Sequence, residues 1–135
     1  MNARMRSERP HENLDVWRRA VEFVVRVYDL TKSFPSEEKF GLTSQIRRAA
    51  VSIPANIAEG AARKSHKEFI YFISNAQGSV SELATELLIA HRLGYLSRDK
   101  YEASKDELNQ IGRMLFGLAR NIRTKTASAA ATSHS

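Results

Sequence analysis

Histidine and glutamate are the first residues to consider, because paired Glu-x-x-His motifs bind two irons in ferritin-like helix bundles. This chain has a single such motif, Glu8 to His11, close to its N-terminus. The other histidines, His66, His91 and His134, are scattered along the chain. We interpret His91 as a partner for the negative end of a helix dipole. The sequence therefore predicts no metal site and no di-iron enzyme.

Covalent catalysis and nucleotide hydrolysis also lack their usual residues. The chain has no cysteine, which excludes thiol catalysis, disulfides and thiolate metal sites. It has no glycine-rich phosphate loop and no Ser/His/Asp set on recognisable elements. We therefore expect a protein that is not an enzyme and holds no cofactor. An enzyme or metal protein that uses Glu59, Glu82 or His91 is the least favoured alternative.

Polar residues form two stripes at helical spacing in the middle of the chain. One stripe consists of Gln45, Arg48, Ser52, Asn56 and Glu59, and the other of Asn75, Ser79, Glu82 and Glu86. Some members break local rules, since Glu59 lies at the negative end of a helix, and Glu82 and Glu86 repel each other. Such breaks are often functional. We interpret the stripes instead as a structural network that fixes helix register or subunit contacts, with Arg63 or Lys64 neutralising Glu59.

The excess of basic residues is the third feature that could bind a partner. The chain has 21 Lys and Arg against 15 Asp and Glu, which gives a formal net charge of +6. The residues we favour for phosphate contacts are Arg113, Arg120, Arg123 and Lys125, with Arg47, Arg63 and Lys64 as second choices. Such a patch binds nucleic acid with strong salt dependence. Alternatively, these side chains only solvate an exposed face and complement a helix C-terminus.

Four helices are expected to carry these residues. Apolar residues recur at spacings of three and four, and Pro35, Gly60 and Gly94 separate the segments. The predicted helices cover residues 13–33, 41–59, 65–93 and 98–125. Short connections between them favour an all-α, antiparallel up-down-up-down four-helix bundle.

Helix ends and interruptions can also be located in the sequence. Gly60 has the place of a residue just past a helix C-terminus. Ser65 and Glu68 form a capping box at the start of the third helix. Pro54 lies inside the second helix, where a proline removes a backbone hydrogen bond and kinks or breaks the helix. Both outcomes at Pro54 remain open at this point.

The first predicted helix is apolar on two sides. Val16, Phe23 and Val27 belong to one stripe, and Trp17 and Val21 belong to the other. A helix in a monomeric bundle needs one apolar arc of about 100°. We take the second stripe as a sign of oligomerisation.

The 135 residues are enough for a single domain with a substantial core. Residues 1–12 are predicted to be a disordered basic tail and residues 126–135 a disordered C-terminal tail, on either side of a bundle over residues 13–125. The charged N-terminus does not resemble a signal peptide, and no stretch has the ~20 apolar residues needed to span a bilayer. We expect a cytoplasmic protein without membrane contacts.

The central segment carries a family resemblance. Residues 45–60 read Gln-Ile-Arg-Arg-Ala-Ala-Val-Ser-Ile-Pro-Ala-Asn-Ile-Ala-Glu-Gly, with Leu14-Asp-Val-Trp17 and Phe34-Pro35 before them and Ser65-His-Lys-Glu-Phe69 and Gly78-Ser-Val-Ser-Glu-Leu83 after them. This pattern resembles the four-helix-bundle family of 23S rRNA intervening-sequence proteins. The resemblance implies a homopentameric ring and no catalytic activity. The chain also looks like the accessory variability determinant of diversity-generating retroelements, a basic pentamer that works with a reverse transcriptase and nucleic acid.

The sequence thus leads to two hypotheses about function. The first is a non-enzymatic, oligomeric helical scaffold that binds nucleic acid, in the form of structured RNA or an RNA-protein assembly, through phosphate contacts. The second is a protein-interaction or structural adaptor whose basic charge is incidental. Loss of nucleic-acid affinity near physiological salt, together with a tight protein partner, would favour the second hypothesis.

Overall fold

The regular structure of this chain is helical throughout residues 9–133, the part that the computed structural model describes. The elements are a 3-10 helix η1 (Pro10–Asn13), α1 (Asp15–Thr31), a 3-10 helix η2 (Ser36–Glu38), α2 (Leu42–Ala61), α3 (His66–Arg92) and α4 (Arg98–Ser133). The all-α class and the four predicted long helices are therefore confirmed.

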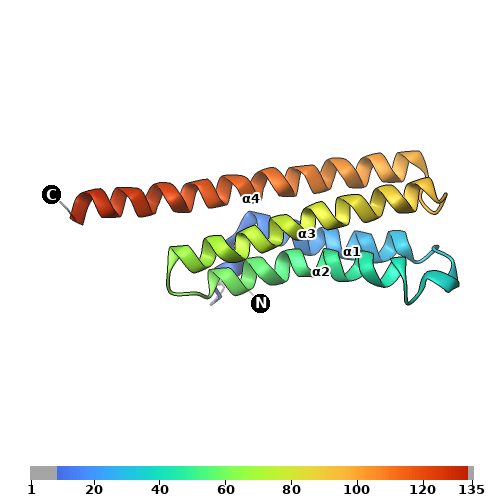
Figure 1. Cartoon of the computed structure of the whole chain (residues 1–135), viewed down its shortest axis with the longest axis horizontal. Coiled ribbons are helices and arrows are strands. Elements are labelled where there is room, and N and C mark those ends of the chain that lie inside the picture. Colours follow the sequence, from blue (N-terminus) through green and yellow to red (C-terminus); the bar gives the residue numbers. More distant parts are fainter. Residues whose placement is uncertain (1–8, 134–135) are drawn as a thin grey trace, which may run out of the picture.

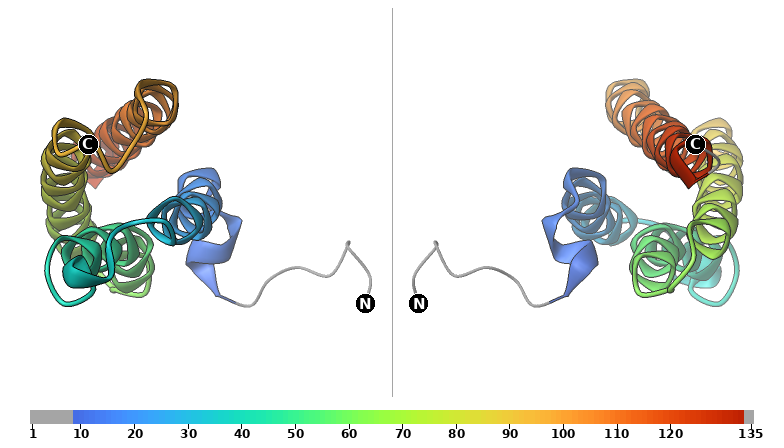
Figure 2. Two further views of the ribbon diagram at one scale, coloured as in Figure 1. Left: turned by 90° about the vertical axis from the view of Figure 1, so that its right-hand side faces the viewer. Right: turned by 90° about the vertical axis from the view of Figure 1, so that its left-hand side faces the viewer.

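The four long helices follow one another in space in the order of the chain. Contacts join α1 to α2, α2 to α3, α3 to α4, and α4 back to α1. Figure 1 shows the helices side by side with short connections, so that each runs opposite to the one before it. The end-on views in Figure 2 show the same order around the bundle. This is the predicted up-down-up-down arrangement.

The core consists of large apolar side chains, mostly aliphatic, that recur at helical spacing on each helix. The largest fully buried side chains are Phe23, Val27, Ile46, Ile53, Ile57, Ile73, Leu83, Leu87, Leu108, Ile111 and Leu115. Each contributes roughly 1.5–3 kcal/mol through removal of apolar surface from water. The spacing seen in the sequence was therefore sufficient to place all four helices around one core.

The two apolar sides of α1 have different environments. Val16, Phe23 and Val27 are buried in the core, whereas Trp17 is only partly buried and packs against it. Val21, farther along the second stripe, is exposed. Val25, one turn after Val21 and farther from the core, leaves 66% of its surface exposed. This single chain therefore leaves part of the apolar surface of α1 uncovered.

Gly60 does not end α2, contrary to our expectation. The helix continues through Gly60 to Ala61, and within residues 9–133 only Gly94 has a positive φ, of 84°. Gly60 is buried, and a Cβ at this position would lie 2.8 Å from the Cβ of Phe72. The glycine is required by close packing between helices and not by a left-handed turn. Gly94 does follow the end of α3, as predicted.

The second helix is continuous across Pro54. A proline lacks the N–H that would bond to the carbonyl of Ala50, but the buried residues on both sides of Pro54 keep the segment packed as one helix. A break of the helix at Pro54 is therefore excluded. At the start of α3, the Ser65 hydroxyl accepts a hydrogen bond from the N–H of Glu68 at 3.1 Å, which is one half of the predicted capping box.

Both predicted tail boundaries differ from the structure. Helix α4 continues to Ser133 instead of ending near Lys125, and its C-terminal part extends beyond the other helices in Figure 1. Alanine has the highest helix propensity, and the Thr126 hydroxyl donates to the carbonyl of Ile122 at 3.0 Å. At the other end, Pro10–Asn13 form η1, with proline in the first turn. The rest of the predicted N-terminal tail, residues 1–8, lies outside the described residues.

Within the described part of the chain, none of the helices is long and apolar enough to cross a membrane.

Candidate functional site

Three of the predicted phosphate-binding residues share one side of α4. Arg113, Arg120 and Arg123 are exposed, and their spacing places them within one arc of a helix that turns about 100° per residue. Phe116 lies between them in the same arc and leaves 62% of its surface exposed. We call Arg113, Phe116, Arg120 and Arg123 the α4 basic face.

The arginines of the α4 basic face have no acidic partner among the described residues. Among residues 9–133, no side chain forms an ion pair with Arg113, Arg120 or Arg123. The sequence from residue 108 to residue 133 contains no aspartate or glutamate. The second half of α4 therefore presents positive charge that no described acidic group neutralises.

The other predicted basic residues lie in three different places. Lys125 is exposed but lies about 140° around the helix from Arg120. Lys64 lies exposed in the turn between α2 and α3. That turn is close to the end of α4, because His66 Nδ1 and Thr126 Oγ1 are 2.7 Å apart. His66 and Arg123 also line one apolar pocket of about 380 Å³. Lys64 therefore lies at the same end of the bundle as Arg123, whereas Lys125 belongs to another side.

Arg63 is held by two neighbours within the described part of the chain. It forms an ion pair with Glu59, one turn earlier in the sequence. Its guanidinium carbon also lies 4.9 Å from the centre of the Phe72 ring, a cation–π contact. Arg63 thus neutralises Glu59, as we had considered, and is less free than Lys64 to contact a ligand.

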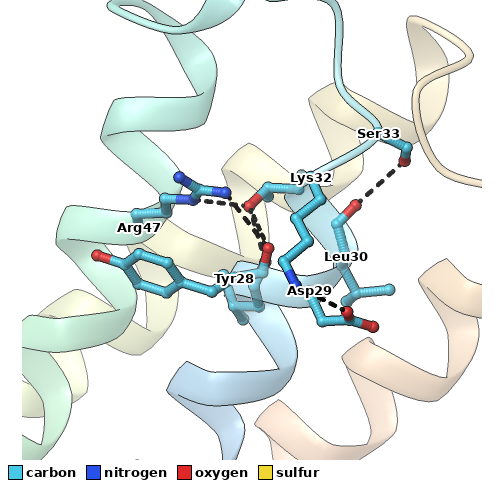
Figure 3. A network of polar contacts seen from close by, with 8 residues as sticks. Tyr28, Asp29, Leu30, Lys32, Ser33 and Arg47 are labelled. Atoms are coloured by element: carbon cyan, nitrogen blue, oxygen red, sulfur yellow. Dashed lines mark hydrogen bonds and ion pairs between the residues drawn. The ribbon is translucent and has the colours of Figure 1, made fainter.

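Arg47 does not belong to the α4 basic face but joins α2 to the end of α1 (Figure 3). Its Nε donates to Thr31 Oγ1 at 2.8 Å, and its Nη2 donates to the carbonyl of Tyr28 at 3.3 Å. The guanidinium carbon lies 4.5 Å from the centre of the Tyr28 ring. The last turn of α1 has no basic residue of its own, so Arg47 supplies the cation that a helix C-terminus favours.

The two polar stripes are joined by a hydrogen bond between two serine side chains. Ser52 Oγ and Ser79 Oγ are 2.6 Å apart, which joins α2 to α3. Ser79 Oγ also donates to the carbonyl of Asn75 at 3.2 Å, and Asn56 Nδ2 donates to the carbonyl of Ser52 at 2.8 Å. These bonds are local or between neighbouring helices, as expected for groups that fix register.

Gln45, Arg48 and Glu82 remain outside these serine contacts. In the antiparallel register set by Ser52 and Ser79, Arg48 is level with Leu83 and therefore near Glu82 along the bundle. All three side chains are exposed, and no described residue forms an ion pair with Arg48 or Glu82. The guanidinium of Arg48 is therefore available for another partner.

Glu86 is the buried member of the second stripe. Only 7% of its surface is exposed, and its Oε1 has no hydrogen-bond partner among the described residues. Burial, followed by the charge of Glu82 and a hydrogen bond with Glu82, together raise the pKa of Glu86 from 4.5 to about 7. The Glu86 carboxyl therefore keeps its proton at a higher pH than an exposed glutamate does.

His91, which we had interpreted as a partner of a helix dipole, makes its contacts where α3 ends and α4 begins. His91 Nδ1 lies 2.9 Å from the carbonyl oxygen of Leu96, and its ring stacks on that of Tyr101 at 4.8 Å. His91 thus joins the end of α3 to the start of α4.

Within residues 9–133, no group of three metal-ligating side chains is close enough to hold a metal ion. Glu8 of the Glu-x-x-His motif lies outside the described residues.

Several interhelical contacts were not apparent from the sequence. Arg26 forms an ion pair with Glu107 and joins α1 to α4. Tyr95 donates its hydroxyl hydrogen to Glu38 Oε2 at 2.9 Å, and this bond raises the pKa of Tyr95. Glu38 Oε1 also accepts a hydrogen bond from the first N–H of α2, that of Leu42, at 3.2 Å. These residues are far apart in the chain, so no local spacing could have paired them.

The arrangement of helices and contacts defines an all-α, four-helix chain with one strongly basic helix face. The chain belongs to the family of 23S rRNA-intervening sequence proteins, whose model matches residues 12–117. The resemblance seen in the sequence is thereby confirmed.

A solved structure has a similar fold. It is the crystal structure of a protein of unknown function from the S23 ribosomal protein family of Bacteroides thetaiotaomicron VPI-5482, with 30% sequence identity and a TM-score of 0.73. The similarity covers 78% of this chain and 95% of that one. Among curated proteins, none matches this chain.

Proposed function

We propose that this protein is a non-enzymatic, oligomeric helical scaffold that binds structured RNA through the α4 basic face. Three arginines on one exposed arc place positive charge where the phosphates of a nucleic-acid backbone can approach. Arginine also matches phosphate geometry, because its planar guanidinium donates two parallel hydrogen bonds. The scaffold works in the cytoplasm and needs no cofactor.

The lack of opposing acidic groups is the observation that carries this proposal. A surface whose arginines only solvate a helix normally has acidic residues between them. The second half of α4 has none from residue 108 onward. Counterions must therefore collect along this face, and their release on binding a polyanion supplies a favourable free energy.

The oligomeric part of the proposal is supported by the uncovered side of α1. Val21 and Val25 lie one turn apart on this side and are both exposed. A second copy that packs on this side would bury these residues. The ring closes if each subunit presents two different surfaces to its neighbours. We propose the pentamer that the family resemblance implies, which would repeat the α4 basic face five times.

Charge reversal on the α4 basic face tests the RNA-binding proposal. Arg120→Glu with Arg123→Glu replaces attraction by repulsion, so the double variant is expected to lose binding to a structured RNA and to keep its mass in solution. A matched control is Arg92→Glu with Arg98→Glu, which changes the net charge equally at the opposite end of the bundle, about 33 Å away along α4. Binding that survives the first double variant, or that both variants lose equally, would refute the assignment to this face.

The alternative is a protein-interaction adaptor with incidental charge. The exposed apolar residues of α1 support binding of a protein partner as much as they support self-association. An adaptor would keep its interaction with a protein partner when Arg120 and Arg123 are reversed, and it would bind RNA only at low salt.

A further inference from the structure

A groove lies between the end of α1 and the first half of α2, on a different part of the molecule from the α4 basic face. It has a volume of about 610 Å³, within the range of ordinary ligand sites. Its lining includes Tyr28, Lys39, Phe40, Thr43, Arg47 and Arg48, and none of its lining residues is acidic. We call it the α1–α2 groove.

Two aromatic rings border the α1–α2 groove. Phe40 leaves 90% of its surface exposed, which places a large apolar ring in water with no described neighbour to cover it. Tyr28 is also exposed, and the guanidinium of Arg47 lies over its ring. The hydrogen bonds of Arg47 to the end of α1 hold this stack in place. The groove therefore offers one free ring and one preorganised cation–aromatic stack.

Polar groups in the groove also lack partners. No described residue pairs with the charged group of Arg48 or with the ammonium of Lys39, which only lies 5.5 Å from the Phe40 ring centre. The side chain of Thr43 is more than nine-tenths buried, and its hydroxyl has no hydrogen-bond partner among residues 9–133. Such an unpaired buried hydroxyl costs about 1–3 kcal/mol.

We propose that the α1–α2 groove binds an unpaired segment of nucleic acid, with bases stacked on Phe40 and Tyr28 and phosphates held by Lys39 and Arg48. This inference rests on the proposed function, because the ligand is again a nucleic acid. It adds a second binding site, which takes an unpaired segment of the nucleic acid. A positively charged groove with exposed aromatic rings is the combination that single strands require.

The chemistry of the groove favours a single strand over the other candidate occupants. The bases of a duplex are stacked on each other, so their faces cannot reach Phe40. An acidic peptide would pair with Lys39 and Arg48 but would leave two flat aromatic faces without a matching surface. A second copy of this chain would bury Phe40 as an apolar anchor, for which any large apolar side chain would serve.

The test compares Phe40→Leu with Tyr71→Leu as the matched control. Tyr71 on α3 is also an exposed aromatic residue, with 62% of its surface in solvent, and it does not line the groove. Leucine keeps apolar surface and removes the aromatic face. The full-length variants are titrated, by fluorescence anisotropy, with a labelled oligouridine of about ten nucleotides and with an RNA duplex of about ten base pairs.

The proposal predicts that Phe40→Leu weakens oligouridine binding roughly tenfold, whereas Tyr71→Leu leaves it within about twofold and neither variant changes duplex binding. Ultraviolet crosslinking of an iodouridine oligomer to the unmodified protein is expected to label Phe40 or Tyr28. Equal oligouridine affinity for both variants would overturn the site while leaving duplex binding, and thus the proposed function, intact. A lower mass in solution for Phe40→Leu with unchanged oligouridine affinity would overturn it in favour of a subunit contact. If neither RNA binds the unmodified protein at low salt, both proposals fail.

Discussion

Phe72 packs directly against the backbone of Gly60, so closely that a Cβ at Gly60 would lie 2.8 Å from the Cβ of Phe72 and 2.9 Å from Cδ1 of Phe69. This contact brings α2 and α3 together just before the turn that carries Arg63 and Lys64. Phe72 in turn receives the guanidinium of Arg63 on its ring. The close approach of two helices thus determines where the basic turn lies relative to the end of α4.

Gly60→Ala is expected to destabilise the protein despite the higher helix propensity of alanine. The propensity gain is about 1 kcal/mol, but the added methyl group has no space and must displace Phe69 or Phe72, at a cost of about 1–3 kcal/mol or more. Gly78→Ala is the control, because a Cβ at Gly78 meets nothing within 4 Å. It should raise the free energy of unfolding by about 0.5–1 kcal/mol. Urea unfolding that shows equal gains for both variants would contradict this account of Gly60.

Arg47→Met should lower the free energy of unfolding by about 1–3 kcal/mol. The substitution removes the hydrogen bonds to Thr31 and to the carbonyl of Tyr28 and the cation at the end of α1. Arg48→Met makes the same chemical change at an exposed residue with no described partner and should stay within about 0.5 kcal/mol of the unmodified protein. Similar losses for the two variants in urea unfolding would show that Arg47 is not a structural link.

Glu86 predicts a dependence of stability on pH. Its pKa in the folded chain, about 7, lies above the value of 4.5 for a free glutamate. The folded state therefore binds the proton more tightly, so the contribution of Glu86 to stability is full below the unfolded pKa and is lost as the pH rises through about 7. Glu86→Gln removes this loss. We expect the variant to be more stable than the unmodified protein by up to about 3 kcal/mol at about pH 8.

The same variant should differ little from the unmodified protein at about pH 4, where Glu86 is protonated in both states. Glu82→Gln is the companion control, because it keeps Glu86 buried and removes only the neighbouring charge. It should lower the pKa of Glu86 without abolishing the pH dependence. Chemical denaturation that gives the same difference between Glu86→Gln and the unmodified protein at both pH values would contradict the assignment.

The sequence predicted those features that depend on periodicity or on local capping. Spacings such as Leu108, Ile111 and Leu115 placed the core, and Ser65 and Gly94 marked real helix ends. Gly60 misled us because a glycine needed for close packing and a glycine that ends a helix look the same in a sequence. The α4 helix continued past Lys125 because small residues that cannot build a core can still continue a helix already started.

The candidate sites were less accessible to sequence reasoning. From the sequence we grouped Lys125 with Arg113, Arg120 and Arg123, although helical geometry places Lys125 on another side of α4. Arg47 was a second choice for phosphate contacts, because no local spacing shows that its partners Tyr28 and Thr31 belong to another helix. The one signal that could have indicated the structural role of Arg47 was the lack of a basic residue in the last turn of α1. The α1–α2 groove depends on the approach of the η2 turn and α2 to Tyr28, which no local pattern encodes.

Phosphate binding by the α4 basic face is best measured by titrating the purified protein with a structured RNA across a salt series, with its mass in solution determined on the same sample. We expect an oligomer for which the logarithm of the RNA affinity falls linearly with the logarithm of the salt concentration, with a slope that gives the number of phosphates contacted. Reversal of Arg120 and Arg123 should reduce that slope. An oligomer that does not bind RNA at physiological salt would contradict phosphate binding by the α4 basic face and favour the protein-interaction adaptor. An RNA affinity that does not change with salt would do the same.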